Sequence, residues 1–210
     1  MLGFAIHTCS PQLGLILQGI DTESQNINRH QVWDLGRDVS SQMHLNMMAF
    51  IEPYRWQDLS FVSVAKGPGG FTGTRVGVVA ARTLAQQLDV PLFGVSTLAA
   101  LAAMSDRKPG SDVAVMMPAK RGDVFGGLYR WTEAGDLDTV RADEVMSAAI
   151  WDDVVSHWSV PTVAVSADVG AGIAESVRGV MAIAMARWKL GQRPEWPAVM
   201  PFYGQHPVHR

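Results

Sequence analysis

Cysteine is nearly absent from this chain of 210 residues, which contains only Cys9. A single cysteine cannot form a disulfide bond within the chain, which is typical of proteins from the reducing cytoplasm. Long apolar runs are also absent, so no segment is predicted to span a membrane. The apolar start, Met1–Ile6, has no basic flank of the kind that precedes a signal-peptide core. The sequence therefore predicts a cytoplasmic protein without a membrane partner.

Positive charge is in slight deficit. The chain has 17 Lys and Arg residues against 20 Asp and Glu residues, a formal net charge of −3. Proteins that bind RNA on their own usually present a basic face to its phosphates, so the balance argues against a stand-alone RNA binder. Apolar residues make up 48% of the chain, which is enough for a globular core. A chain of this length can form one large domain or two small ones.

A glycine-rich stretch between an apolar run and a helical pattern is the most informative part of the sequence. The run Phe61–Ala65 predicts a buried strand, and Arg75–Leu88 has apolar residues at helical spacing. Thr72 or Thr74 is predicted to cap the helix. A strand, a glycine turn and a helix N-terminus together aim free backbone N–H groups at one point, where an anion can bind. The candidate phosphate- or nucleotide-facing residues are Gly67, Gly69, Gly70, Thr72 and Gly73.

The spacing of these glycines matches neither common phosphate-binding motif. No Gly-Lys-Ser/Thr follows for a Walker A loop, and the glycine after Gly67 and Gly69 falls at Gly73, one position too late for G-x-G-x-x-G. A tight turn between a strand and a packing helix would use the same residues. At least one of Gly69, Gly70 and Gly73 is expected to have a positive φ angle.

Three segments around this loop resemble a known family. They are Lys66–Gly77 (KGPGGFTGTRVG), Ala80–Ala85 (AARTLA) and Val90–Leu98 (VPLFGVSTL). Together they are similar to the signature of the bacterial TsaB (YeaZ-type) family of tRNA threonylcarbamoyladenosine biosynthesis proteins. The similarity is dense over Phe61–Ala103 and thinner elsewhere, and it runs in register to the C-terminus.

The two halves of the chain are predicted to repeat one plan of hairpin, strand, helix, strand, glycine turn and helix. The expected strands are Leu2–His7, Leu13–Leu17, His30–Leu35, Phe61–Ala65, Pro91–Val95, Val113–Met117, Val124–Trp131 and Pro161–Ser166, with a loop at Asp21–Asn28. The expected helices are Arg37–Ile51, Arg75–Leu88, Thr97–Met104, Ser147–Trp158 and Ile173–Leu190, and a second glycine turn is expected at Asp168–Gly172. Two α/β lobes with a cleft between them are the expected result.

The family resemblance implies the same architecture: an α/β, actin-like or Hsp70-like (ASKHA) fold with two duplicated lobes and mixed sheets. The polar segment Ser105–Ser111 marks the boundary between the lobes. The predicted lobes are residues 1–104, with the glycine loop and interface helices, and residues 105–210, with a proline-rich tail. In such folds the hairpin turns and the glycine turns face the cleft and hold nucleotide phosphates.

Two carboxylates that actin-like proteins use to organise metal and phosphate are missing here. The resemblance places the first at the end of the first strand, where this chain has His7, and the second before Ala119, where it has Pro118. Neither imidazole nor proline offers the hard oxygen ligands that a divalent cation prefers. We therefore expect neither independent ATP hydrolysis nor kinase activity.

No catalytic or metal-binding residue is predicted. His7 and Cys9 share a face of the first strand, but no carboxylate lies nearby in sequence to orient the pair. The catalytic sister subunit of the family carries a His-x-x-x-His metal pair on a helix, whereas His44 is followed four residues later by Met48. No cofactor is expected, although weak ATP or ADP binding in a complex is compatible with the family.

The helices of the first half are the candidate partner surface. In the family, the corresponding helices form an interface that is used either for homodimers or for the catalytic partner. Gly77, Ala80 and Ala81 are small enough to let another helix approach closely. The same face could instead pack on the chain's own sheet. The candidate interface residues are Met43, Met47, Val76, Val79 and Arg82.

The resemblance implies a non-catalytic subunit that supports a paralogous catalytic subunit, TsaD, and acts with an ATPase subunit, TsaE. Together they transfer a threonylcarbamoyl group from its adenylate to N6 of the adenosine next to the anticodon, in tRNAs reading codons that begin with A. The chain alone is expected to be a homodimer and to meet tRNA only through the complex. Two alternatives stay open: an actin-like nucleotide-binding phosphotransferase or glycoprotease-type enzyme, and a homodimeric regulatory module unrelated to tRNA.

Overall fold

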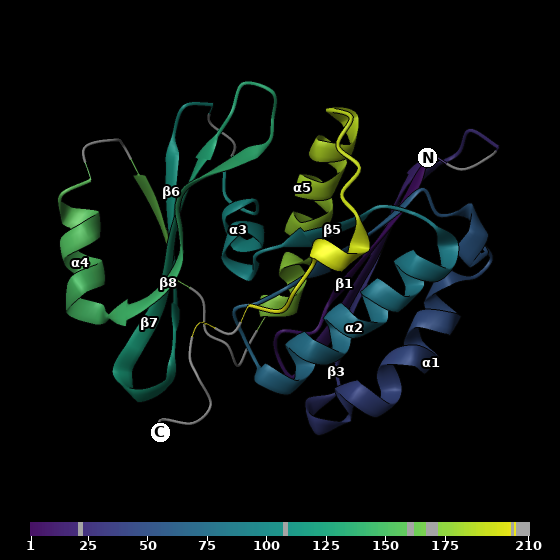
Figure 1. Ribbon diagram of the computed structural model, residues 1–210, viewed down its shortest axis with the longest axis horizontal. Coiled ribbons are helices and arrows are strands. Elements are labelled where there is room, and N and C mark those ends of the chain that lie inside the picture. The colour runs from purple at the N-terminus through teal and green to yellow at the C-terminus, as the bar shows by residue number, and fades with distance from the viewer. Residues whose placement is uncertain (21–22, 107–108, 159–161, 167–171, 203, 205–210) are drawn as a thin grey trace.

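The computed structural model describes residues 1–20, 23–106, 109–158, 162–166, 172–202 and 204. Each of two lobes is built on one β-sheet, and helices lie between the two sheets and on their outer faces (Figure 1). No helix in this described part of the chain is both long enough and apolar enough to cross a membrane.

The first lobe holds a five-stranded sheet that mixes parallel and antiparallel pairs. Its strands, in spatial order, are β3 (Asn26–Asp34), β2 (Gln12–Ile20), β1 (Leu2–His7), β4 (Phe61–Ala65) and β5 (Leu92–Val95). β2 pairs antiparallel with β1 and β3, whereas β4 pairs parallel with β1 and β5. Because β1 and β4 are parallel, His7 and the glycine loop come to the same end of the sheet.

The second lobe repeats this plan with four strands. In spatial order they are β8 (Leu137–Ser147), β7 (Asp123–Trp131), β6 (Asp112–Pro118) and β9 (Thr162–Ser166), with the 3-10 helix η3 (Lys120–Gly122) between β6 and β7. β7 pairs antiparallel with β6 and β8, and β9 pairs parallel with β6. The order matches that of β3, β2, β1 and β4. The protein therefore has the duplicated, actin-like α/β fold with mixed sheets that the sequence predicts.

The outer face of the first sheet is covered by two helices, α1 (Val39–Ile51) and α2 (Phe71–Leu88). Alternation along the strands decides which side chains meet them. Phe4 and Ile6 on β1 pack with these helices, whereas Ala5 belongs to the core on the opposite face. Two further 3-10 helices precede α1 and β4, namely η1 (Gly36–Asp38) and η2 (Trp56–Asp58).

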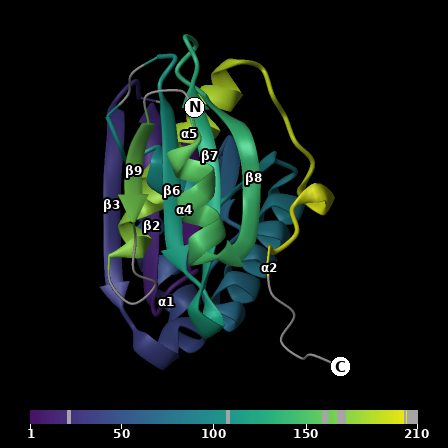
Figure 2. The ribbon, with the colours of Figure 1, turned by 90° about the vertical axis from the view of Figure 1, so that its left-hand side faces the viewer.

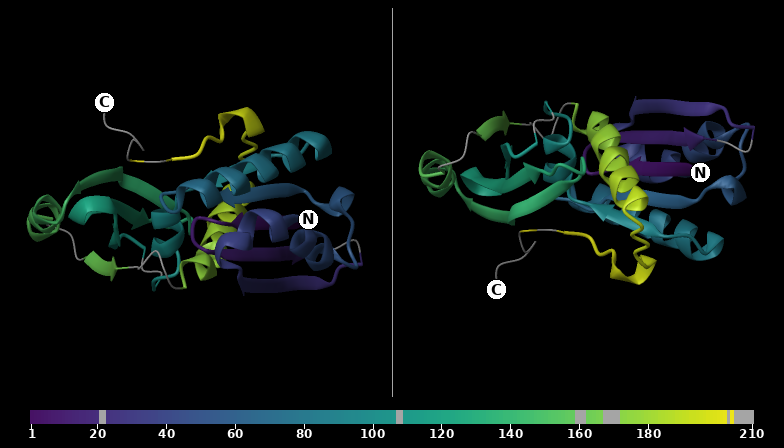
Figure 3. Two further views of the ribbon diagram at one scale, coloured as in Figure 1. Left: turned by 90° about the horizontal axis from the view of Figure 1, so that it is seen from below. Right: turned by 90° about the horizontal axis from the view of Figure 1, so that it is seen from above.

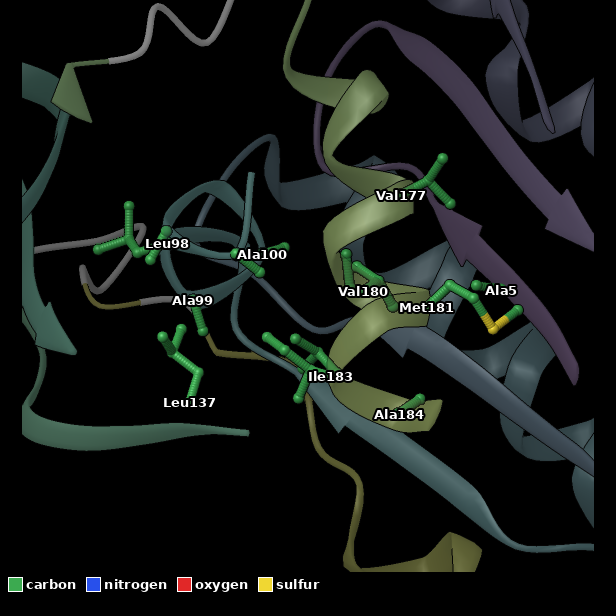
Figure 4. Packing of buried hydrophobic residues seen from close by; sticks show 14 of the residues in the cluster. Ala5, Leu98, Ala99, Ala100, Leu137, Val177, Val180, Met181, Ile183 and Ala184 are labelled. Carbon is green, nitrogen blue, oxygen red and sulfur yellow. The ribbon is translucent and has the colours of Figure 1, made fainter. Parts of the chain in front are cut away.

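Between the two sheets lie α3 (Thr97–Ala102), α5 (Val177–Lys189) and the short η4 (Ile173–Ser176). Their buried residues join the inner faces of both sheets into one apolar cluster. In Figure 4, Ala100 of α3 faces Val180 of α5, and Met181 reaches from α5 toward Ala5 of β1. The two lobes therefore share a core.

The outer face of the second sheet is covered by α4 (Ala148–Ser156) (Figure 2). Trp151 of α4 is buried against the sheet beside Val124 and Leu128 of β7. Gly126 leaves room for the indole, because a Cβ at that position would lie 2.3 Å from the Trp151 ring. Glycine is therefore used in β7 for close packing of a helix.

Three features differ from the sequence prediction. β3 begins at Asn26, inside the predicted loop Asp21–Asn28, because the strand pairs with β2 along its whole length. No strand is predicted for residues 132–146, yet β8 covers most of them as a largely exposed edge strand. The predicted turn Asp168–Gly172 lies outside the described residues except for Gly172.

The last segment of the chain packs differently from the predicted lobe ranges. The first sheet is drawn from residues 1–104 and the second from residues 105–210. However, α5 lies against β1, β2, β4 and β5 of the first sheet (Figure 3), and η5 (Trp196–Ala198) lies on α2. The division into two domains at residue 104 therefore stays a prediction, while the packing assigns α5 to the first sheet.

Candidate functional site

The glycine loop is packed tightly around the residues that follow β1. The Gly70 amide donates a hydrogen bond to the Cys9 carbonyl at 2.6 Å. A Cβ at Gly69 would lie 2.2 Å from that same oxygen, and a Cβ at Gly73 would lie 2.1 Å from the Thr8 carbonyl oxygen. Gly69 has a φ of 156°, so the expected positive φ is confirmed. Gly69 and Gly73 thus allow the loop to approach Thr8 and Cys9.

The start of α2 differs from the predicted cap. Gly70 occupies the N-cap position, and no side chain caps the helix there. The Thr74 hydroxyl instead donates to the Gly70 carbonyl at 2.8 Å, and Thr72 is exposed. The Thr8 hydroxyl donates to the Gly73 carbonyl at 2.8 Å. The prediction of a threonine cap is therefore wrong, because the helix begins one turn earlier than its apolar periodicity indicates.

The beginning of the loop is covered by the C-terminal tail. Gly67 has a φ of 102°, and a Cβ there would lie 2.3 Å from the Phe202 carbonyl oxygen. The Phe202 amide donates to the Lys66 carbonyl at 2.7 Å, and the Gly67 carbonyl accepts from the Thr97 amide at 2.8 Å. The phosphate-facing role of Gly67, Gly69, Gly70, Thr72 and Gly73 stays a prediction, since several of these residues already serve packing within the chain.

Replacing Gly73 with alanine is expected to lower the free energy of unfolding by about 1–3 kcal/mol, because the added Cβ would overlap a backbone oxygen. Gly70→Ala is the matched control: its Cβ would meet nothing closer than 3.5 Å, and its φ of −61° suits any residue. Denaturant unfolding of both variants measures the difference. Equal losses of stability would contradict the packing role of Gly73.

His7 lies at the end of β1 and is fully buried. Its Nδ1 accepts a hydrogen bond from the Cys9 amide at 3.4 Å, and its Nε2 has no hydrogen-bond partner among the described residues. Burial lowers the pKa of His7 from 6.5 to about 4, so the ring is neutral at pH 7. The His7 ring is hydrogen-bonded to the backbone amide of Cys9. The Cys9 thiol is hydrogen-bonded to the Ala65 carbonyl instead.

Cys9 is a buried thiol rather than an activated nucleophile. Its Sγ donates to the Ala65 carbonyl at 3.4 Å. Burial raises the pKa of the Cys9 thiol, although hydrogen bonds with Thr74 and Thr97 act in the opposite direction. The thiol is therefore protonated at neutral pH, and only the thiolate is a strong nucleophile.

Pro118 ends β6 at the position that corresponds to His7 in the first lobe, and it is exposed. No group of three or more His, Cys, Asp and Glu side chains that could hold a metal ion occurs among the described residues. The ends of the two equivalent strands thus present a neutral imidazole and a proline.

A polar cluster between the lobes was not predicted from the sequence. Ser96 donates to Asp143 Oδ2 at 2.5 Å, and Tyr129 donates to the other carboxylate oxygen. The Ser96 hydroxyl also caps α3 by accepting from the Leu98 and Ala99 amides at 3.0 and 3.2 Å. Burial raises the pKa of Asp143, and burial together with the carboxylate raises the pKa of Tyr129 well above 10. A serine directly before a predicted helix is a typical cap, so the sequence offered a signal for Ser96. It offered none for Asp143, because Asp143 lies on β8, a strand that was not predicted.

The predicted partner residues separate into buried and exposed groups. Met43 is fully buried and Met47 is 5% exposed, so both belong to the core under α1 and are not available to a partner. Val76 is partly buried against the same core. Arg82 is half-buried, with its guanidinium 5.5 Å from the centroid of the Trp196 ring. Of the five, Val79 is the large apolar residue on the surface, 60% exposed.

Two exposed residues on α1 were missed. Leu45 is 63% exposed and Met48 is 61% exposed, on the side of α1 opposite to the buried Met43 and Met47. Helical periodicity could have separated the two stripes, because Leu45 and Met48 are three residues apart and neither belongs to the buried spacing.

Comparison with known proteins finds similarity to one family over part of the chain. A family model described as "TsaD: tRNA N6-adenosine threonylcarbamoyltransferase" matches residues 52–154. The chain is 42% identical over 101 residues to the "tRNA threonylcarbamoyladenosine biosynthesis protein TsaB" of Bacillus subtilis, over 48% of this chain and 43% of that protein. It is 37% identical over 79 residues to the TsaB protein of Escherichia coli, over 37% of this chain and 34% of that protein. Over these segments the chain is similar to proteins of the TsaB/YeaZ-type family.

The fold extends the likeness over the whole chain. YeaZ from Pseudomonas aeruginosa superposes with a TM-score of 0.71 at 21% identity, over 97% of this chain and 100% of that one, which shows a common fold. The aligned segments of the two TsaB relatives cover less than half of each protein's length. In this chain, the glycine-rich segment Lys66–Gly77 packs the start of α2 against Thr8 and Cys9.

Proposed function

We propose that this TsaB/YeaZ-type chain is a non-catalytic, cytoplasmic subunit that supports a TsaD-type catalytic subunit. The supported reaction is transfer of a threonylcarbamoyl group to N6 of the adenosine next to the anticodon of tRNA. A TsaE-type ATPase is the third component, and tRNA meets the chain only within the complex. Two relatives support the pathway, since both are named tRNA threonylcarbamoyladenosine biosynthesis proteins. The match to a TsaD family model fits a paralogue of the transferase.

The observation that carries the non-catalytic assignment is the state of His7. A buried, neutral imidazole at the end of β1 supplies neither negative charge nor an oxygen ligand for a metal-bound phosphate. Pro118 leaves the equivalent position of the second lobe without a polar side chain. The buried Cys9 thiol, whose pKa is raised, also argues against a peptidase-type nucleophile. These residues favour a supporting role over the phosphotransferase and glycoprotease alternatives.

The docking surface of the proposal is the exposed side of α1 and α2. Leu45 and Met48 on α1 and Val79 on α2 are each about 60% exposed, and the two helices lie side by side on the outer face of the first sheet. Large exposed apolar side chains on neighbouring helices mark a candidate protein–protein contact. We assign two contacts to this surface: self-association of the free chain and binding of the TsaD-type subunit. A second copy of the chain and the TsaD-type subunit would therefore compete for it.

Val79→Glu is expected to leave the monomer folded and to abolish self-association, binding of the TsaD-type subunit and tRNA modification together. The reason is that a carboxylate in a helix–helix contact must be desolvated without a partner. Met48→Glu on α1 is expected to act alike. Met47→Glu is unsuitable, because Met47 is 5% exposed and a glutamate there would disrupt the core. Sedimentation velocity, co-purification and a reconstituted modification assay measure the three effects.

Ile150→Glu on α4 is the matched control, since Ile150 is 54% exposed and lies on the outer helix of the other lobe. It is expected to change none of the three. If the α1 and α2 variants still bind the partner, docking through this surface is wrong. If the unaltered chain neither binds the TsaD-type subunit nor promotes modification, the proposed function itself is wrong.

A further inference from the structure

The residues after α5 form a strap along the outside of the molecule. We use this word for residues 194–202, which run down the free edge of β5, past α2 and toward the second lobe. In Figures 1 and 2 this segment, in yellow, stands at the periphery and contributes to neither sheet. Beyond it, Gly204 reaches the second lobe, where a Cβ would lie 2.7 Å from the Phe125 ring.

The ends of the strap are held by main-chain hydrogen bonds. The Leu92 amide donates to the Pro194 carbonyl at 3.1 Å, and the Phe202 amide donates to the Lys66 carbonyl at 2.7 Å. β5 is the last strand of the five-stranded sheet, so its outer backbone groups would otherwise form an open edge. The strap covers that edge much as an added peptide would cover it.

The body of the protein is shaped to receive the strap. Val199 is 6% exposed, and a Cβ at Gly94 of β5 would lie 2.7 Å from Val199 Cγ1. The three atoms nearest to that Cβ all belong to Val199. Gly67 makes the same allowance for the Phe202 carbonyl, at 2.3 Å. Gly94 and Gly67 therefore leave room for Val199 and Phe202, which lie three positions apart in the strap; we call these two positions the seats of the strap.

Between these anchors most residues of the strap are exposed. Glu195, Pro197, Ala198 and Met200 are exposed, and the prolines have no amide hydrogen to donate to the edge of β5. Arg82 of α2 reaches the strap at two points, lying over Trp196 and donating to Met200 Sδ at 3.4 Å. Val199, Trp196 and Phe202 pack against the hydrophobic cores, so the strap is held at a few points with exposed residues between them. A segment attached at few points is one that can open locally before the rest of a protein unfolds.

We propose that the strap is a displaceable cover of the β5 edge, which leaves and re-enters its seats while the two sheets stay folded. When the strap is released, the edge of β5 forms a groove for one extended segment. That segment would place an aliphatic side chain over Gly94 and, three residues later, a main-chain carbonyl over Gly67 with an aromatic side chain against the shared core, as Val199 and Phe202 do. The inference rests on the strap and its seats, and it is independent of the proposed function.

Hydrogen exchange in the intact chain tests the local opening. The Leu92 amide donates to a carbonyl of the strap, and the Phe202 amide of the strap donates to a carbonyl of the body. The Val62 amide donates to the Pro91 carbonyl inside the sheet, at 3.0 Å, and serves as the reference. We expect Leu92 and Phe202 to exchange at least tenfold faster than Val62, at a rate that low denaturant concentrations do not change. Val199→Asp should accelerate both further and leave Val62 unchanged. Exchange of all three amides in step with global unfolding would overturn the proposal.

Binding in trans tests the groove. Full-length Val199→Asp protein, with its own strap released, is titrated with a fluorescent peptide of residues 191–202 of the unaltered sequence. We expect the unaltered peptide to bind saturably to the Val199→Asp protein. A peptide that itself carries Val199→Asp should not bind. The unaltered peptide should also not bind when the protein carries Gly94→Ala in addition to Val199→Asp. The three atoms nearest to the added methyl of Gly94→Ala all belong to Val199. No binding of the unaltered peptide, or equal binding of both peptides, would overturn the proposal.

Discussion

Gly179→Val is expected to lower the free energy of unfolding by about 3 kcal/mol, the upper end of what overpacking a core usually costs. On an exposed helix, replacing glycine with a larger residue tends to stabilise, because glycine in a helix interior costs about 0.5–1 kcal/mol. Here the contact between helices reverses the sign. A Cβ at Gly179 of α5 would lie 2.0 Å from the Ala100 carbonyl oxygen of α3, which is backbone and cannot move by rotation of a side chain.

Ala182→Val is the matched control for this change, because Ala182 is partly exposed and lies on the same helix. It introduces the same residue without the contact to α3. On helix propensity alone, Ala182→Val would be the more destabilising of the two changes, because alanine is the best helix former and glycine one of the worst. A larger loss of stability in Gly179→Val therefore reports the contact with α3. Chemical denaturation of both variants gives the comparison. A Gly179 variant as stable as the Ala182 variant would show that α3 and α5 are not packed as closely as the shared core requires.

The second large effect is a loss of stability in mild acid that depends on His7. Burial lowers the pKa of His7 to about 4 in the folded protein, against 6.5 as its ordinary value. As the pH falls below 6.5, His7 becomes protonated in the unfolded chain but stays neutral in the folded chain, which favours unfolding. The contribution of His7 to the free energy of unfolding is therefore constant above pH 6.5 and falls between pH 6.5 and about 4. Below about pH 4 the ring is protonated in the folded protein too, and His7 causes no further loss of stability. The loss by pH 5 is about 2 kcal/mol.

His7→Asn isolates this contribution. The asparagine Oδ1 can replace Nδ1 as acceptor for the Cys9 amide, and asparagine does not titrate. Urea unfolding of both proteins at pH 7, 6 and 5 should show the wild type losing stability faster, while the carboxylates that titrate in both proteins cancel in the difference. Parallel pH dependence of the two proteins would mean that His7 is hydrated in the folded state.

The elements that can be predicted from the sequence are those whose determinants are local. Phe61–Ala65 is a run of apolar residues that suits a strand buried on both faces, and the glycines after it can only interrupt regular structure. The helix that follows is apparent from its periodicity, although its true start at Phe71 is set by contacts of Gly70 and Gly73 with the end of β1. The edge strand β8 was missed because its outward side chains are polar.

The direction of a side chain is less accessible to sequence than the presence of a helix. α1 carries large apolar residues on both sides, so the pattern alone allowed Met43 and Met47 to be assigned to a partner surface. The first sheet decides otherwise: it buries Met43 and Met47 beneath α1 and leaves Leu45 and Met48 outside. On α2 the candidates also separate only in the structure, because Val79 is exposed whereas Val76 is partly buried against the core.

By itself, the sequence determined the order of the strands and helices other than β8, because each of them depends on neighbours in the chain. It also determined that the unusual residues His7 and Pro118 follow the apolar runs of β1 and β6. Only the tertiary structure decided what those residues meet. It buried His7 without a partner for Nε2, joined Ser96 to Asp143 across the lobes, and placed α5 on the first sheet. These outcomes depend on contacts between residues far apart in sequence, and hydrophobic period and local propensity carry no information about such contacts.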